Sequence, residues 1–402
     1  MVEAMATRRA VIVGGGAAGF FLAIRLKELR PGAEVVILER GRDVLAKVRV
    51  SGGGRCNCTN TFEGVGDLAE AYPRGHRLMR RLFHTFGPAD ARQWFETRGV
   101  RLVAQPDHCV FPASQSSQTI VDCLSGLARR MGVEVRVGTR VDDAPGLLGE
   151  ADAVAVCAGG MPQSGAQGWM GLDADEIVPA VPSLFSLSVA DEGLHDLMGA
   201  VVCRATLSIA GTKLKACGDL LLTHWGMSGP AALRLSSYAA RELHARGYKA
   251  DLIVNWTSQT PDEALADLRE MAESAPRKMV GNTHPAALPS RLWEFLVARA
   301  LGDNRCRRWS ELGKRDMNRL ASTLTSTPVA MCGRAPFRDE FVTAGGVSLQ
   351  SVDPKTLESK RHPGLFFAGE ALDIDGVTGG FNFQAAWTTA FVAAGGMAAR
   401  LG

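Results

Sequence analysis

Excess charge of either sign is missing from this sequence. Its 402 residues include 45 Lys and Arg and 42 Asp and Glu, which leaves a net charge of +3. That balance gives little support to a polyanionic partner such as a nucleic acid. Hydrophobic residues make up 46% of the chain, so it can bury a sizeable core and divide into two or three domains.

A long hydrophobic run is also missing. Residues 10–24 follow Arg8 and Arg9 without a charge, but this run is shorter than the roughly 20 residues of a membrane span. The glycines at 14–16 and the lack of a small-residue cleavage site argue against a secretory signal. We expect a cytoplasmic protein with no membrane partner.

The nine cysteines form neither a disulfide framework nor a metal-binding pattern. Cys56 and Cys58 are separated by one residue, which is too close for CxxC chemistry. We therefore expect reduced thiols and no metal site. These two cysteines are either redox-active or buried and inert, and the buried interpretation is favoured.

A glycine-rich turn lies near the N-terminus, where residues 10–39 predict a strand, a helix and a second buried strand. Gly14 permits the tight turn, Gly16 lets the backbone approach a pyrophosphate, and Gly19 lets the helix pack close to the sheet. A chance glycine turn is the alternative. The setting between two predicted strands favours a dinucleotide site.

The same unit supplies groups for both ends of an adenosine diphosphate. Ala17 and Ala18 open the predicted helix, whose free amides and dipole favour a pyrophosphate. Glu39 lies twenty residues beyond Gly19, where a carboxylate holds the ribose hydroxyls, and Arg40 follows it.

A second glycine-rich segment, residues 51–60, lies in a region (41–60) that we expect to be an irregular loop. Its glycine amides, its cation and its amide side chains can wrap an anion or the polar edge of a flavin ring. An ordinary surface loop is the alternative. The candidate contacts in it are Ser51, Gly52, Gly53, Gly54, Arg55, Cys56 and Asn57.

A predicted buried strand over 151–160 ends in Ala158, Gly159 and Gly160. These residues either let the chain turn beside the expected dinucleotide or form an ordinary strand-to-loop turn. Val141, which follows a predicted strand over 133–137, is a candidate for backbone contact with the adenine.

The C-terminal region carries a third signature after a buried strand. Gly369 and Glu370 follow this strand at the sheet edge where ligands bind, and Glu370 or Asp373 can hold ribityl hydroxyls. Solvated carboxylates in a loop are the alternative. An apolar helix then begins, and its N-terminal amides can face the flavin pyrimidine. The candidate contacts there are Gly380, Phe381 and Asn382. Together with the N-terminal signature, this one predicts FAD.

The order of elements predicts an α/β protein with an insertion. We expect a discontinuous FAD-binding domain (1–181 and 345–402), a β-rich domain (182–257 and 325–344) and a helical subdomain (258–324).

Within these domains, apolar periodicity predicts single helices over 77–98, 117–131 and 229–246. His224 precedes the last of them, as a candidate acid or base facing the flavin or as a structural histidine.

Four segments resemble the BaiN/YhiN-like family of bacterial FAD-dependent (NAD(P)/FAD) oxidoreductases, also called aminoacetone oxidase family FAD-binding enzymes. They are Gly14–Gly19, Ser51–Asn60, Thr223–Pro230 and Gly369–Gly376. The resemblance implies a non-covalent FAD in a glutathione-reductase-like domain, with a β-barrel-like domain and a small helical one. Some members look like reductases of conjugated double bonds in steroid-like substrates.

The leading hypothesis is an FAD-dependent oxidoreductase that transfers a hydride through flavin N5 to or from a small organic substrate. Glu39 repels a 2′-phosphate, and one dinucleotide fingerprint is visible, so NAD(P)H would bind transiently elsewhere. An oxidase that needs no nicotinamide is also open.

Two rivals remain. The first is a flavoprotein that acts on or binds RNA or a protein partner, and the absence of a long basic stripe argues against it. Its basic surface would comprise Arg77, Arg80, Arg81, Arg129 and Arg130. The second is an NAD-only dehydrogenase, which leaves the C-terminal signature unexplained.

Overall fold

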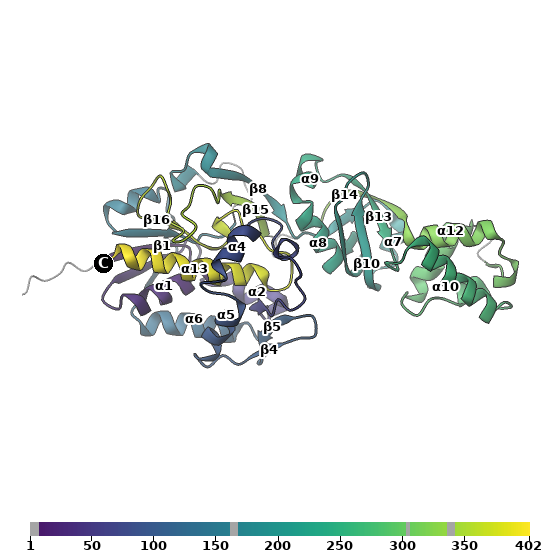
Figure 1. The fold of residues 1–402 in the computed structure, drawn as a ribbon, viewed down its shortest axis with the longest axis horizontal. Helices are drawn as coiled ribbons and strands as arrows, with labels where there is room; N and C mark the ends of the chain where they lie inside the picture. Colours follow the sequence, from purple (N-terminus) through teal and green to yellow (C-terminus); the bar gives the residue numbers. More distant parts are fainter. Residues whose placement is uncertain (1–7, 161–167, 303–305, 336–341) are drawn as a thin grey trace, which may run out of the picture. The chain divides into compact units, whose positions relative to one another are not determined.

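The computed structural model describes residues 8–160, 168–302, 306–335 and 342–402. The chain divides into two compact units (Figure 1). Unit 1 comprises Met1–Pro182 and Val342–Gly402, and unit 2 comprises Ser183–Phe341.

The centre of unit 1 is a five-stranded parallel sheet with the order β16-β7-β1-β2-β6. Its strands are β1 (Arg9–Val13), β2 (Glu34–Leu38), β6 (Glu134–Arg136), β7 (Ala153–Val156) and β16 (Leu365–Phe367). Four of these strands, β16, β7, β1 and β2, are apolar runs, as a parallel sheet covered on both faces requires. The predicted α/β class is confirmed, and the C-terminal strand β16 joins the sheet that the N-terminal strand β1 begins.

The first and last helices of unit 1 pack together (Figure 1). They are α1 (Ala17–Leu29) and α13 (Phe381–Arg400). The guanidinium of Arg30 donates to the carbonyl of Ala398 at 3.0 Å, and the rings of Phe21 and Trp387 lie 5.4 Å apart. Helix α13 is apolar on almost every side, which is typical of a helix buried within a domain.

A three-stranded sheet and short helices complete unit 1. They are β3 (Thr59–Asn60), β4 (Leu102–Ala104), β5 (Cys109–Pro112), α2 (Ala46–Gly54), α3 (Leu68–Ala71), α4 (His76–Leu82), α5 (Pro88–Glu96) and α6 (Gln118–Arg130).

Two predictions about this region are wrong. The predicted helix over 77–98 is two helices, because Gly87 caps α5 and Pro88 occupies its first turn. The predicted irregular loop over 41–60 contains the helical turn of α2, which kinks at Ser51.

Unit 2 contains the predicted barrel, closed by six strands in the order β10-β11-β12-β9-β14-β13. The strands are β9 (Leu187–Val189), β10 (Val201–Ile209), β11 (Lys215–Thr223), β12 (Gly226–Ser228), β13 (Ala250–Asn255) and β14 (Thr327–Arg334). A separate pair of strands, which belongs to unit 1 except for Ser183, comprises β8 (Ile177–Ser183) and β15 (Val342–Val347).

The helices of unit 2 are α7 (Glu192–His195), α8 (Pro230–Tyr238), α9 (Ala240–Ala245), α10 (Pro261–Ser274), α11 (Ser290–Leu301) and α12 (Lys314–Thr325). The predicted single helix over 229–246 is wrong, since α8 and α9 are separated at Ala239. Short 3-10 turns occur in both units, at η1 (Pro145–Gly149), η2 (Gly168–Met170), η3 (Ala174–Glu176), η4 (Val280–Asn282), η6 (Trp309–Glu311) and η7 (Gly369–Ala371).

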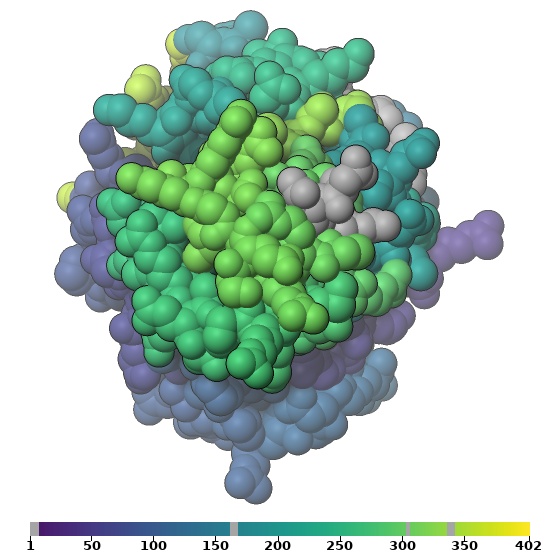
Figure 2. All heavy atoms as spheres, turned by 90° about the vertical axis from the view of Figure 1, so that its right-hand side faces the viewer, coloured from purple at the N-terminus to yellow at the C-terminus, as the bar shows by residue number. Residues whose placement is uncertain are grey.

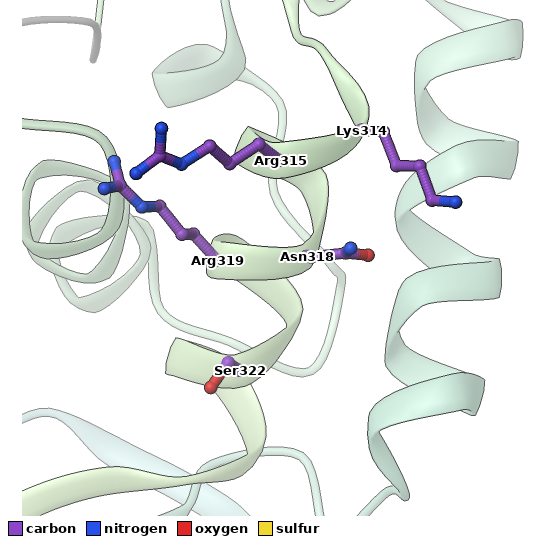
Figure 3. Close-up of a pocket in the computed structure, with 5 residues that line it drawn as sticks. All are labelled: Lys314, Arg315, Asn318, Arg319 and Ser322. Atoms are coloured by element: carbon purple, nitrogen blue, oxygen red, sulfur yellow. The ribbon is translucent and has the colours of Figure 1, made fainter.

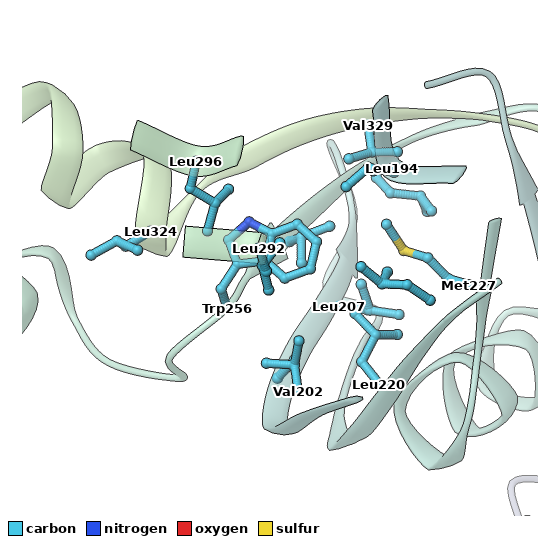
Figure 4. Packing of buried hydrophobic residues seen from close by; sticks show 14 of the residues in the cluster. Leu194, Val202, Leu207, Leu220, Met227, Trp256, Leu292, Leu296, Leu324 and Val329 are labelled. Carbon is cyan, nitrogen blue, oxygen red and sulfur yellow. The ribbon is translucent and has the colours of Figure 1, made fainter. Parts of the chain in front are cut away.

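One apolar core joins the barrel and the helices of unit 2 (Figure 4). Trp256 is fully buried and its indole donates to the hydroxyl of Thr327 at 2.8 Å. Leu207 of the barrel and Leu292 of α11 belong to the same cluster. Within the described ranges, no helix is both long enough and apolar enough to cross a bilayer.

Candidate functional site

The first glycine-rich turn is shaped by close backbone contacts in unit 1. Gly14 has a φ of +112°, and a Cβ there would overlap the carbonyl of Cys157 at the end of β7. A Cβ on Gly19 would overlap the carbonyl of Gly14. These two positions therefore require glycine, because the strand, the turn and the helix approach one another there.

The start of α1 is open. Gly16 is its N-cap, provides no side-chain hydrogen bond, and would place a Cβ more than 4 Å from any atom. The first amides of a helix have no intrahelical partner, so those at Ala17 and Ala18 can bind an anion. This cradle fits a pyrophosphate.

Glu39 lies at the end of β2, next to this turn. One carboxylate oxygen accepts from the amide of Gly15 at 2.7 Å, and the other accepts from the amide of Gly41 at 2.6 Å. Its position is therefore fixed beside the pyrophosphate cradle. Arg40 is exposed and Val141 is half-buried. Two residues before Val141, the amide of Thr139 donates to the carbonyl of Glu39 at 2.8 Å.

The second glycine-rich segment packs on the start of α13. The side-chain nitrogen of Asn57 donates to the carbonyl of Thr59 at 3.0 Å, and its side-chain oxygen accepts from the backbone amide of Gly380 at 3.1 Å. The hydroxyl of Thr59 donates to Gln384 at 2.5 Å, and the indole of Trp387 donates to the carbonyl of Cys58 at 2.9 Å. Segments more than 300 residues apart in the chain thus form one wall.

The glycines in this segment are exposed and have positive φ angles. Gly53 and Gly54 would place a Cβ in open space, whereas Gly52 lies against the ring of Phe111. Arg55 folds back over the same ring at 4.3 Å, and its Nε donates to the carbonyl of Gly52 at 3.2 Å. The open side of this loop is therefore its glycine backbone.

Three buried thiols of unit 1 are protonated at neutral pH. Burial raises the pKa of Cys56 to about 12 and the pKa of Cys157 to about 12, and it raises the pKa of Cys58 well above its usual value. Because the thiolate is the reactive form, the structure favours inert thiols over redox-active ones.

The C-terminal signature reaches the start of α1. A Cβ on Gly369 would lie 2.9 Å from the Cβ of Ala18. Glu370 accepts from the ammonium group of Lys47 at 2.9 Å and from the amide of Thr343 at 2.9 Å. Gly159 and Gly160 lie against this carboxylate, while Ala158 is exposed.

The sequence reasoning did not identify Lys47, and its pairing with Glu370, 323 residues away, has no local signal. The amide of Asp373 donates to the carbonyl of Val347 at 2.9 Å.

The loop before α13 is fixed by groups that the sequence reasoning also missed. Arg74 pairs with the fully buried carboxylate of Asp375, and the hydroxyl of Tyr72 donates to the carbonyl of Phe381 at 2.8 Å. Both hydrogen bonds of the Asn382 side chain, each 2.8 Å long, go to the backbone of Gly376. The side chain of Asn382 therefore shapes the loop, which leaves the helix N-terminal amides to face a ligand.

His224 is the one residue of the candidate set that belongs to the other unit. It belongs to unit 2, in the turn between β11 and β12, whereas the other candidates belong to unit 1. Its ring is exposed and meets the ring of Trp225 edge-to-face at 4.2 Å.

Comparisons with known proteins match nearly the whole chain. A family model described as the HI0933-like protein Rossmann domain matches residues 8–396. A ribosomal RNA dihydrouridine synthase of Escherichia coli (strain K12) is 29% identical, over 96% of this chain and 96% of its own length. A 3-dehydro-bile acid delta(4,6)-reductase of Clostridium scindens is 27% identical, over 95% and 97%.

A solved structure, the open conformation of a flavocytochrome c3 fumarate reductase, aligns with a TM-score of 0.47 and 18% identity, over 98% of this chain and 78% of that one.

Proposed function

The chain belongs to the HI0933-like family of FAD-dependent Rossmann-fold oxidoreductases, and we propose that it reduces a carbon–carbon double bond conjugated to a carbonyl group. This proposal rests on the reaction for which two relatives are named. A delta(4,6)-reductase of a 3-keto bile acid and a dihydrouridine synthase are both named for saturating such a bond.

The residues of unit 1 have distinct roles in this proposal. Gly14 and Gly16 leave room for the FAD pyrophosphate at the start of α1, and Glu39 holds the ribose hydroxyls of its adenosine half. When bound, FAD supplies hydride transfer through N5. The amides that begin at Phe381 place the positive end of α13 against the flavin pyrimidine, where reduction adds negative charge.

NAD(P)H is the proposed electron donor. In this proposal FAD fills the one dinucleotide-binding fingerprint visible in the sequence, to which Glu39 belongs. The nicotinamide nucleotide therefore binds transiently at another surface. The test is anaerobic mixing of the yellow holoprotein with NADH or NADPH, followed by a 3-keto-4-ene steroid. Bleaching by the nucleotide and recovery of colour with the steroid are expected. A flavin that neither nucleotide bleaches contradicts the NAD(P)H-driven reaction.

A uracil base in ribosomal RNA is the second candidate substrate. The specific observation that favours it is the E. coli relative, which is named a ribosomal RNA dihydrouridine synthase and matches along 96% of its length. Uracil also presents a double bond conjugated to a carbonyl, so the same chemistry serves both candidates. The two are separated by supplying reduced holoprotein with a small enone or with ribosomal RNA transcripts and measuring dihydrouridine by mass spectrometry.

A further inference from the structure

One face of α12 carries a group of exposed polar side chains. Their spacing of i, i+1, i+4, i+5 and i+8 makes them neighbours along the helix, where they line a shallow hollow. In Figure 3, Lys314 and Asn318 extend to one flank of the helix, and Arg315 and Arg319 extend to the other. The residues of this basic face are Lys314, Arg315, Asn318, Arg319 and Ser322. The other side of α12 packs into the core of unit 2 through Met317, Leu320 and Leu324. Figure 2 looks onto this helical part of unit 2.

The three cations of the basic face lack anionic partners among the described residues. The acid of the same helix turn, Asp316, pairs with Arg307 at 3.0 Å and so leaves them unneutralised. Elsewhere in unit 2, by contrast, Arg299 pairs with Asp191 at 2.5 Å. Within the described ranges, these three side chains are therefore exposed cations that take part in no ion pair.

Helix stability does not account for these cations. Lys314 and Arg315 occupy the first turn, where the helix dipole is positive and favours acids instead. Arg315 and Arg319 are four residues apart, and Figure 3 shows their guanidinium groups extending to the same side of the helix. Like charges at this spacing repel each other. A negatively charged ligand would remove both unfavourable effects.

We propose that the basic face of α12 binds the phosphate backbone of RNA. Arg315 and Arg319 present planar donor groups that match phosphate oxygens, and Asn318 and Ser322 add neutral donors at the rim of the same hollow. Such contacts give affinity without reading the base sequence. This inference rests on the RNA candidate in the proposed function and supplies that candidate with a docking surface.

RNA fits this face better than a membrane surface does. Peripheral binding to a membrane requires large apolar side chains next to the cations. Of the exposed large apolar residues in the described part of the chain, none belongs to α12.

The test measures binding of the full-length holoprotein to a fluorescein-labelled RNA hairpin by fluorescence anisotropy, over salt concentrations from about 50 to 200 mM. The variant is the triple substitution K314Q/R315Q/R319Q. The matched control, R81Q/R129Q/R130Q, removes the same charge from exposed arginines of α4 and α6. NADPH oxidation with a small enone is measured in all three proteins.

The α12 variant is expected to bind RNA about tenfold more weakly or worse, and its slope of log affinity against log salt should fall by roughly 2 to 3. Its enone reduction should be unchanged. Equal losses in both variants, or no RNA binding by the wild-type protein, would overturn the inference. If no enone or RNA is reduced but the α12 variant still loses RNA binding, the proposed function fails and this inference stands.

Discussion

The cofactor loops of unit 1 and the basic face of α12 in unit 2 are built in opposite ways. In the loops, the chain is fixed by backbone contacts and by buried pairs such as Arg74 with Asp375. On α12, the cations are held by no partner within the described residues, and their positions oppose the stability of the helix. Substitutions should therefore destabilise the first region and leave the second intact.

The largest effect is expected for Gly14→Ala. The new Cβ would overlap the carbonyl of Cys157 and would hold an L-residue at a φ of +112°. We expect a loss of about 4 kcal/mol in the free energy of unfolding and loss of bound flavin. Urea titration and the visible spectrum measure both. Gly32→Ala is the control, because its Cβ would have no atom within 4 Å, and a colourless control protein would refute the steric argument.

Arg74→Gln comes next. It removes the positive charge that pairs with the carboxylate of Asp375, which has no exposed surface, and should cost about 3 kcal/mol. Arg80→Gln is the matched control, since its pair with Asp67 is about 60% exposed on both sides and should contribute less than about 1 kcal/mol. Urea midpoints compare the two. Equal shifts would show that burial does not distinguish these pairs.

The buried thiols predict a weaker, pH-dependent effect. The pKa of Cys56 and that of Cys157 are raised from 9.0 to about 12 in the folded state, so unfolding favours ionisation. Their contribution is complete below about pH 9 and is lost as the pH rises toward 12, by up to about 1.4 kcal/mol per unit for each thiol.

The measurement is the difference in unfolding free energy between the wild type and C56A/C157A from about pH 8 to pH 10.5. This difference should shrink with rising pH. A constant difference contradicts the burial of the thiols.

The smallest effect should have the opposite sign. Arg315→Gln removes a positive charge that lies one helical turn from Arg319 and in the first turn of α12. It should therefore raise the free energy of unfolding by about 0.3 kcal/mol. A change of the same size in Ser322→Ala, which alters no charge, would show that electrostatics is not the cause. Differential melting curves at low salt resolve the two variants.

Local patterns predicted the framework of this fold. The first β-α-β unit, the strand before Gly369 and the barrel strands have strong apolar signals, and the confirmed fold class follows from them. The break between α4 and α5 had a signal at Pro88 that the helical periodicity concealed. The pair of Lys47 with Glu370 had none, because the two residues meet only through the tertiary fold.

The residues of the candidate site also fall into two groups, those that the sequence alone reveals and those that it does not. Glycines that must turn or approach a backbone, such as Gly14 and Gly19, are visible in one sequence. Residues that fix the loops from a distance, such as Tyr72 and Arg74, look like ordinary surface or core residues until the chain has folded.

The order of strands in the central sheet has a consequence for biosynthesis. Strand β16 and helix α13 follow unit 2 in the chain, yet β16 pairs with β7 and α13 packs on α1. Unit 2, a continuous stretch of chain, can fold during translation, whereas the N-terminal part of unit 1 must wait until β16 and α13 have been synthesised. A chain that stops before β16 would carry a folded insertion attached to a domain that has never held its flavin.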